Sequence, residues 1–428
     1  MNGIDVHQYF TENAEAFVSP TSHQMKTSQI LQIAGQVRAL KAAGNEICNL
    51  TVGDFSPEYF PVPECVTTRA SLAYSRGETN YPPPDGLMEL RTAIADVYAR
   101  RLGLNYGPES VCIGSGARPP IFATLSLLTE PGDVTVSCLP AWNMSYYAQI
   151  FQTRHTFITT TAENNFFPTV AQIEATLDRA RVILLNTPLN PTGTMISPDV
   201  LRGIAAAIVA ENKRRRSTNR RPVMLLFDQV YWLLTMKGHT HCHPVQLVPE
   251  CAPYVINIDA ASKSFAGTGL RVGWAVLPPV LQERMRAFMG HMGAWAPKPE
   301  QLGIASLMAQ PKLMDAYLTD MQTRIQQRLD TLYNGIMDMK SRGVPVDAIS
   351  PQGAIYLSFR VDMIGNGFSS NEEIRAHLLE EAGVAVVPFQ AFDLHEDTGW
   401  LRMSVGAVGV AELSGALQRL EATLRKRR

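Results

Sequence analysis

The sequence lacks an excess of charge and any close pairing of cysteines. Its 428 residues carry 38 basic and 39 acidic side chains, and this balance disfavours a general nucleic-acid binder or an acidic solvating tail. The cysteines are scattered without a CxxC pair, which is typical of a reducing compartment and not of a disulfide framework. They are Cys48, Cys65, Cys112, Cys138, Cys242 and Cys251.

Signals for membranes and secretion are also missing. Residues 1–17 carry acidic and polar side chains where a signal peptide needs a basic start and an apolar run. The longest apolar stretches, such as 182–185 and 224–227, are far too short to cross a bilayer. The one basic cluster, 213–221, is interpreted as a solvated connection. We therefore expect a cytoplasmic protein that binds neither membrane nor nucleic acid.

The sequence does contain short apolar runs that alternate with longer helical patterns, which is typical of an α/β fold with a mostly parallel sheet. Strands buried on both faces should read as nearly continuous apolar blocks. The expected strands are 110–113, 134–138, 182–185, 223–227, 255–258 and 272–276. The expected helices between them are 119–128, 171–178, 198–213 and 280–289.

The two ends of the chain combine long helical patterns with short strands. We infer that the ends meet as a smaller α+β domain beside a large central domain. The expected helices are 29–43, 314–340, 371–381 and 411–425, and the expected strands are 354–361 and 401–405. The expected boundaries are 1–65 for the N-terminal segment of the small domain, 66–329 for the large domain and 330–428 for the C-terminal part of the small domain.

Four polar segments follow expected strands, at the edge where ligands of open α/β sheets collect. In the first, 186–193, two prolines and a glycine force an irregular loop that leaves the Asn190 amide free, although an ordinary Asn-Pro turn reads the same way. In the second, Asp228 ends a buried strand and needs a cationic partner. Tyr231 follows on the same side of a helical turn. An Asp that caps the next helix is the alternative.

The third segment, 261–274, contains a lysine, three hydroxyl residues, three glycines and an arginine in one connection between strands. Hydroxyls and an arginine suit a phosphate, and a lysine in a partly dry site can attack a carbonyl. A surface loop explains the glycines and serines but not the whole set. The fourth segment, 114–119, places free backbone N–H groups at a helix N-terminus, where they suit an anion. A plain strand-to-helix turn is its alternative.

In order and spacing, these segments resemble the pyridoxal-phosphate-dependent aminotransferases of fold type I, class I/II, of the aspartate aminotransferase-like kind. The resemblance extends from about residue 47 to about residue 405. It implies a large domain with a mostly parallel central sheet flanked by helices, and a smaller α+β domain built from both chain ends. Its most specific pieces are the loop 186–193, Asp228 with Tyr231, and Ser262 and Lys263 with Arg271.

The resemblance implies a role for each matching residue. Lys263 would form a Schiff base with pyridoxal 5'-phosphate and move the substrate proton. Asp228 would pair with the pyridinium nitrogen and keep the ring an electron sink. Asn190 and Tyr231 would donate hydrogen bonds to the phenolic oxygen of the cofactor.

The cofactor phosphate would be held by Ser262, Arg271 and the backbone of Gly116, Ala117 and Arg118. Trp142 would stack on the cofactor ring. Tyr81 would reach the phosphate of a neighbouring subunit, which implies a homodimer with shared active sites. The implied substrate-binding residues are Gly53, Arg118, Trp142, Asn190 and Arg402, of which Arg402 would take the α-carboxylate in a bidentate pair.

The implied reaction is a ping-pong amino transfer from an L-amino acid to a 2-oxo acid. We expect aspartate as the donor and 2-oxoglutarate as the acceptor, with Arg118 binding the distal carboxylate. The same cofactor residues also serve an aromatic aminotransferase, a C–S lyase, a cyclopropane-forming synthase or a decarboxylase, and these alternatives stay open. A Rossmann-type nicotinamide oxidoreductase is a remote alternative, because 114–116 lacks a third glycine and Lys263 would have no role.

Three features stay open in the sequence. The cluster His239–His243 is too tight for a regular zinc site, so we expect a polar loop and no bound metal. Trp295 and Lys298 lie in a segment that departs from the family pattern, and their roles are undecided. Tyr356 follows a Pro-Gln-Gly-Ala-Ile stretch that resembles a substrate-facing strand, and the sequence does not decide between substrate contact and packing.

Overall fold

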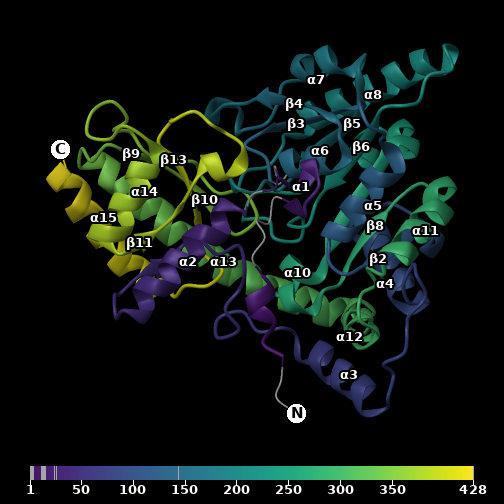
Figure 1. Ribbon diagram of the computed structural model, residues 1–428, viewed down its shortest axis with the longest axis horizontal. Helices are drawn as coiled ribbons and strands as arrows, with labels where there is room; N and C mark the ends of the chain where they lie inside the picture. The colour runs from purple at the N-terminus through teal and green to yellow at the C-terminus, as the bar shows by residue number, and fades with distance from the viewer. Residues whose placement is uncertain (1–3, 11–15, 24, 26, 143, 428) are drawn as a thin grey trace.

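The computed structural model describes residues 4–10, 16–23, 25, 27–142 and 144–427, so parts of the expected segment 1–65 lie outside the described residues. Two lobes lie side by side (Figure 1). The larger is built from the middle of the chain, and the smaller contains α2 near one end and α15 at the other.

The large lobe contains a seven-stranded sheet in the order β2-β8-β7-β6-β5-β3-β4. Six strands run in one direction and β8 runs against both of its neighbours. The strands are β2 (Val111–Gly114), β3 (Val134–Leu139), β4 (Arg154–Thr159), β5 (Ala180–Asn186), β6 (Met224–Asp228), β7 (Val255–Ala260) and β8 (Gly273–Val276).

Helices cover both faces of this sheet. Ile183 and Leu185 of β5 face one hydrophobic cluster, while Val182 and Leu184 face another. This alternation explains the continuous apolar runs, since each fully buried aliphatic side chain contributes about 1.5–3 kcal/mol. The helices of this lobe are α3 (Glu64–Ser75), α4 (Met88–Leu102), α5 (Arg118–Leu128), α6 (Met144–Phe151), α7 (Val170–Leu177), α8 (Pro198–Ser217), α9 (Pro244–Leu247), α10 (Ala261–Ser264), α11 (Gln282–Met292) and α12 (Lys298–Met308).

The small lobe contains an antiparallel sheet in the order β12-β13-β10-β9. A short parallel pair, β1 with β11, joins the two ends of the chain. The strands are β1 (Cys48–Asn49), β9 (Val346–Ala348), β10 (Tyr356–Val361), β11 (Val384–Ala385), β12 (Val387–Pro388) and β13 (Trp400–Ser404).

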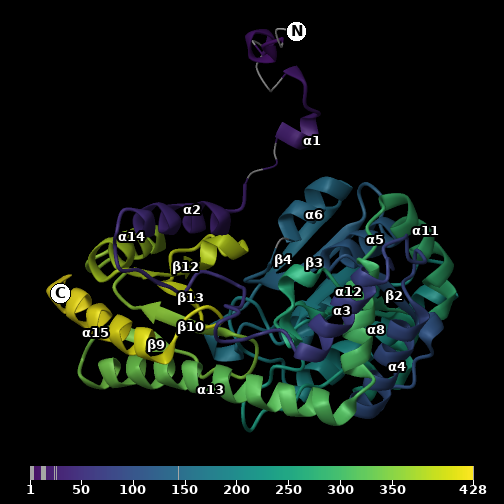
Figure 2. The same cartoon turned by 90° about the horizontal axis from the view of Figure 1, so that it is seen from below.

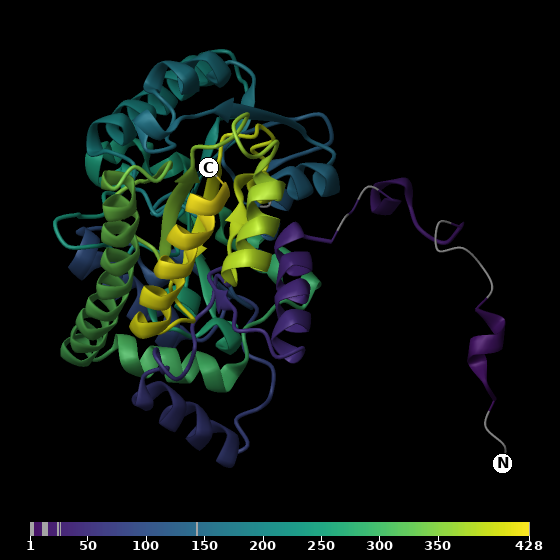
Figure 3. The same ribbon diagram turned by 90° about the vertical axis from the view of Figure 1, so that its left-hand side faces the viewer.

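Four helices lie side by side on the small lobe, in the order α13, α15, α14 and α2 (Figure 3). The helix α13 continues beneath the large lobe as well (Figure 2): its Met314 and Leu318 belong to the large-lobe core, and Met321 to Met339 belong to the small-lobe core. The remaining helices are α1 (Pro20–His23), α2 (Gln29–Ala42), α13 (Pro311–Ser341), α14 (Asn371–Ala382) and α15 (Val410–Arg427).

The predicted elements lie within a few residues of the observed ones. The helix α8 begins at Pro198, as expected, and the Ser197 side chain caps it by accepting from the Val200 N–H. The strand β4 is absent from the prediction because it is a sheet edge with mostly part-exposed side chains and has no continuous apolar block. Of the helices in the described residues, none combines the length and apolarity needed to cross a membrane.

Candidate active site

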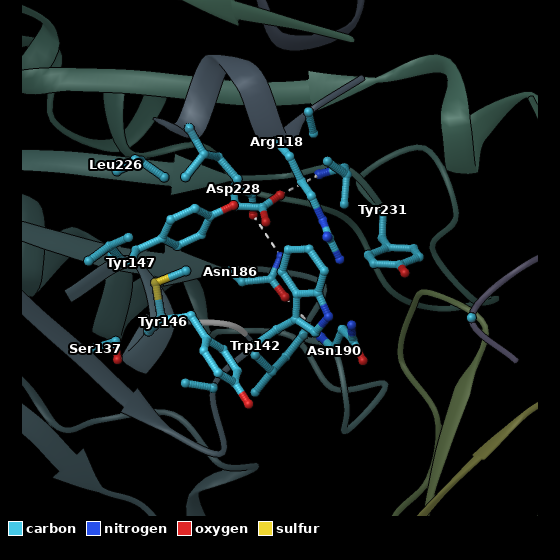
Figure 4. Close-up of a pocket in the computed structure, with 18 of the residues that line it drawn as sticks. Arg118, Ser137, Trp142, Tyr146, Tyr147, Asn186, Asn190, Leu226, Asp228 and Tyr231 are labelled. Atoms are coloured by element: carbon cyan, nitrogen blue, oxygen red, sulfur yellow. Dashed lines mark hydrogen bonds between the residues drawn. The ribbon is translucent and has the colours of Figure 1, made fainter. Parts of the chain in front are cut away.

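A cavity of about 910 Å³ opens where the carboxyl ends of β5 and β6 face the small lobe. Large-lobe residues such as Asp228 and Lys263 line one side, and the small-lobe residues Tyr356 and Arg402 line another. Figure 4 shows aromatic side chains, including Trp142, gathered around its polar groups. The cavity therefore contains both polar groups suited to catalysis and apolar surface suited to a ring.

Lys263 lies in the short helix α10, directly after β7. Its Nζ donates to the backbone carbonyl of Gly53 and lies 5.8 Å from the centre of the Tyr231 ring. Burial lowers the pKa of Lys263 to about 8, although the charge of Asp54 opposes the shift. The lysine is therefore neutral in a substantial fraction of molecules near pH 8, and a neutral amine is the nucleophilic form.

Asp228 is the last residue of β6 and lies at the floor of the cavity beside Asn186 of β5 (Figure 4). Its Oδ1 accepts from the Val230 N–H at 3.1 Å, and the Asn186 side chain donates to its backbone carbonyl at 3.1 Å. Desolvation raises the pKa of Asp228 to about 6. Among the described residues, no cation lies within ion-pair distance of this carboxylate, so a cationic group of a ligand would find a matching partner here.

Arg402 is 2% exposed and belongs to β13. It donates to the Asn190 side-chain oxygen at 3.0 Å and to the Thr51 carbonyl at 2.6 Å, while its Nε has no partner in the described part of the chain. Its guanidinium lies between two aromatic rings, 4.7 Å from the centre of Tyr356 and 4.9 Å from that of Phe392. Arg402 is thus a buried cation that pairs with no carboxylate among the described residues, which suits a carboxylate of a ligand.

A group of donors suited to an anion lies at the start of α5. Arg271 donates to the Thr268 carbonyl at 2.7 Å and to the Ser115 carbonyl at 3.0 Å. A Cβ on Gly116 would lie 2.1 Å from Arg271 Nη2, so only glycine leaves room for this arginine. Ser262 lines the cavity nearby, together with Ala117. At the start of α5 the backbone N–H groups come from Ala117 and Arg118, because Pro119 and Pro120 carry none, and together with Arg271 they suit a phosphate.

Arg118 points into the cavity toward Trp142, with its guanidinium carbon 4.5 Å from the centre of the ring (Figure 4). It is exposed at the opening, and no acidic side chain forms an ion pair with it within the residues that the structure describes. The pair therefore presents a cation on an aromatic surface to whatever enters the cavity.

Tyr81, Trp295 and Lys298 lie apart from this cavity. The Tyr81 side chain is 80% exposed and its ring meets Trp295 edge to face at 4.9 Å. Lys298 donates to the Asn80 side chain at 3.0 Å. Apart from Gly116, which lies behind the cavity against Arg271, the structure brings the other expected site residues to the wall of one cavity, but it leaves Tyr81 outside the site of its own chain.

The histidine cluster differs from the expected polar loop. His243 is fully buried, accepts from the Val245 N–H to cap α9, and meets Asn257 Oδ1 at 2.6 Å. His241 meets Gln229 Oε1 at 3.2 Å. Burial lowers the pKa of His243 to about 4 and that of His241 to about 3. These are neutral packing histidines, and the described residues contain no cluster of three or more metal-ligating side chains.

Several cavity residues were missed in the sequence. Asn186 is one of them. A signal for it existed, because Asn186 ends β5 directly opposite Asp228 at the end of the neighbouring parallel strand β6. Tyr147 directs its hydroxyl toward Asp228 (Figure 4). Asp54 does not line the cavity itself, but it accepts from the hydroxyl of the cavity residue Thr268 at 2.6 Å. No local pattern marks Tyr147 or Asp54, because each meets its partner across a long sequence separation.

Comparisons with known proteins agree with this geometry. The family described as aminotransferase class I and II matches residues 45–420. An aspartate aminotransferase of Rhizobium meliloti (strain 1021) is 30% identical over 420 residues, which cover 95% of this chain and 97% of that protein. A probable aspartate/prephenate aminotransferase of Thermus aquaticus is 29% identical, with 94% and 97% covered. The solved aspartate aminotransferase of Rhizobium meliloti superposes with a TM-score of 0.85 at 27% identity, covering 95% of this chain and 98% of that chain.

Proposed function

The chain belongs to the class I and II aminotransferase family, and from this premise we propose that it transfers the amino group of L-aspartate to 2-oxoglutarate with pyridoxal phosphate held on Lys263. The predictions of an aminotransferase and of a type I α/β fold are confirmed by the family match and the structural neighbours. The observation that carries the proposal is one cavity that contains both the Lys263 amine and a buried Arg402 with no acidic partner among the described residues.

The residues present fit pyridoxal phosphate. Asp228, which pairs with no cation in the described part of the chain, offers a carboxylate to a ring nitrogen, and Lys263 offers an amine to an aldehyde. Ser262, Arg271 and the start of α5 offer donors to a phosphate, with room made by Gly116. We assign the phosphate contacts to Ser262, Arg271 and the backbone of Gly116, Ala117 and Arg118, and ring stacking to Trp142.

When bound, this cofactor supplies an electron sink for the bond that is broken at the substrate Cα. The protein then has three tasks. Arg402, held by Asn190 and Thr51, fixes the substrate α-carboxylate, so that the Cα–H bond has one orientation. Lys263 Nζ, with its lowered pKa, accepts and returns the proton at Cα. The rings of Tyr356 and Phe392 exclude water from the Arg402 pair.

The assignment of aspartate rests on Arg118. A dicarboxylic substrate carries a second carboxylate that needs a second cation, and Arg118 is free to supply it on the Trp142 surface. Relatives named aspartate aminotransferase support the same donor. We assign Gly53, Trp142, Asn190, Arg118 and Arg402 to the substrate contacts.

We also propose a cytoplasmic homodimer, in which Tyr81 reaches the phosphate of a second copy. Its exposed ring, outside the cavity of its own chain, supports this arrangement. The domain boundaries 1–65, 66–329 and 330–428 remain our proposal, supported by the β1–β11 pair that joins the chain ends.

One absorption experiment tests the proposed function. Purified protein loaded with pyridoxal phosphate is scanned before and after L-aspartate is added without any 2-oxo acid. We expect a visible band that bleaches as oxaloacetate forms. A band that does not respond to aspartate would overturn the donor, and a panel of aromatic and neutral amino acids would then identify it. Protein that binds no cofactor would overturn the whole proposal.

A further inference from the structure

Tyr356 lines the small-lobe side of the cavity, and the function proposed above uses its ring but gives its hydroxyl no task. It belongs to β10 and is 1% exposed. Its hydroxyl lies 2.6 Å from the hydroxyl of Tyr231, and the two rings meet edge to face with centres 5.5 Å apart. The same ring lies under the Arg402 guanidinium. A single side chain therefore contacts two groups on which the proposed reaction depends.

The backbone at Gly53 leaves space for this hydroxyl. A Cβ on Gly53 would lie 2.8 Å from the Tyr356 oxygen, so any larger residue would push the tyrosine away. The Gly53 carbonyl also accepts from Lys263 Nζ. Tyr356 is thus fixed against the same stretch of backbone that positions the lysine.

The two hydroxyls are each other's hydrogen-bond partners, and neither has another side-chain or backbone partner in the described part of the chain. Each carries one proton, so only one of them donates to the other. If Tyr356 donates, the proton of Tyr231 is free to point into the cavity. If Tyr231 donates, its oxygen presents only lone pairs there. An ionised phenolic oxygen in the cavity accepts hydrogen bonds and cannot donate, so it matches only the first arrangement.

We propose that Tyr356 is a positioning residue that donates to the Tyr231 oxygen and thereby directs the Tyr231 proton toward the phenolic oxygen of the bound cofactor. This inference rests on the proposed function, which places pyridoxal phosphate on Lys263. Consecutive hydrogen bonds polarise one another, so Tyr231 becomes a stronger donor. A phenolic oxygen with a strong donor carries less negative charge and holds the proton on the Lys263 nitrogen less tightly.

The test is a pH titration of the visible absorption band of the loaded enzyme. Tyr356→Phe keeps the ring under Arg402 and removes only the hydroxyl. We expect it to raise the pKa read from the band by about 0.5–1, which is a three- to tenfold change in proton affinity. Tyr231→Phe is expected to raise it further. Asp54, Asp228, Arg118, Arg271 and Arg402 are the charged groups that face Lys263, and all of them are retained in each variant.

A double variant separates positioning from packing. If Tyr356 acts through Tyr231, Tyr231→Phe with Tyr356→Phe has the same pKa as Tyr231→Phe alone. Additive shifts, or a wild-type pKa in Tyr356→Phe, would overturn the inference. Tyr317→Phe is the matched control, because its hydroxyl donates to the Pro61 carbonyl at 3.0 Å outside the cavity, and its band should titrate like the wild type.

Steady-state rates give a second readout. We expect Tyr356→Phe to lower kcat about three- to tenfold while KM for the amino acid stays within about twofold, because the Arg402 contact is kept. Gly53→Ala, which crowds the Tyr356 hydroxyl, should shift the band in the same direction and provides an independent variant if Tyr356→Phe does not fold. Loaded protein without a visible band would instead overturn the proposed function, and this inference with it.

Discussion

The cavity and the end of α8 both carry arginine and aspartate side chains, but these differ in whether they have ion-pair partners. Near α8, Arg214 and Arg220 both pair with Asp178, and Arg221 pairs with Asp133. In the cavity, Asp228 and Arg402 have no oppositely charged side chain within ion-pair distance among the described residues. A buried charge without a partner lowers the stability of the fold unless a ligand pairs with it, whereas an exposed ion pair contributes little to stability. The comparison separates a binding site from a solvated cluster.

The largest effect is expected at Lys263. Lys263→Ala removes both the nucleophile and the proton carrier, so kcat should fall by at least about 10⁴-fold. Lys340→Ala, which removes a surface pair with Asp347 at 2.8 Å, is the control and should keep its rate. Borohydride trapping followed by intact mass measurement checks the covalent role. Trapping of cofactor on the Lys263→Ala protein would contradict the assignment.

Arg402 is expected to show the next largest effect. Arg402→Lys keeps the charge but loses the planar donor fork, so kcat/KM for the amino donor should fall about 10²–10³-fold. The corresponding change near α8, Arg220→Lys, alters an exposed pair and should change kcat/KM by less than about twofold. Equal effects of the two variants would remove the distinction between the two regions.

The pH dependence of folding stability tests whether Asp228 is an unpaired buried charge. Its folded-state pKa of about 6 lies above the ordinary value of 3.8, so the folded apoprotein loses stability as pH rises between these values. Asp228→Asn should therefore stabilise the apoprotein at pH 7.5 by about 1–2 kcal/mol, after allowance for screening by water in the cavity. Urea unfolding at pH 4 and pH 7.5 measures the difference.

The reverse sign is expected at Asp178, where Arg220 and Arg214 lower the pKa of the carboxyl. Its small stabilising effect is present at neutral pH and disappears as pH falls through the lowered pKa. Asp178→Asn should accordingly destabilise the protein slightly at pH 7.5 and not at low pH. If Asp228→Asn and Asp178→Asn changed the free energy of unfolding in the same direction at pH 7.5, the distinction between an unpaired buried carboxylate and a paired surface carboxylate would be wrong.

A different kind of effect, a change in substrate selectivity, is expected at Arg118. Arg118→Ala should lower kcat/KM for acidic donors at least about tenfold more than for neutral ones, because only acidic donors lose an ion pair. Parallel assays with aspartate and alanine measure the ratio. Equal losses would show that Arg118 serves the cofactor or Trp142 and not the substrate.

The sequence predicted those parts of the molecule that depend on local chemistry. Buried strands such as β5 read as apolar runs because both of their faces are covered. Asn190, Asp228 and Lys263 follow strand ends, so topology alone brings them together. The reversal of β8 was not predicted, since an apolar block carries no direction. The Tyr231–Tyr356 contact was not predicted either, because it joins residues 125 positions apart.

The long helix α13 ties the two lobes mechanically. It has 31 residues, hence a length of about 46 Å, and its side chains pack into the hydrophobic cores of both lobes. Any rotation of the small lobe against the large one must therefore tilt or bend α13. From Met321 to its end at Ser341 the helix extends about 30 Å, so a tilt of about 5° near Met321 would displace that end by about 2.6 Å. A change in the angle of α13 near Leu318 and Met321, where the two cores meet it, would therefore move the small-lobe wall that carries Arg402 and Tyr356 relative to the large lobe.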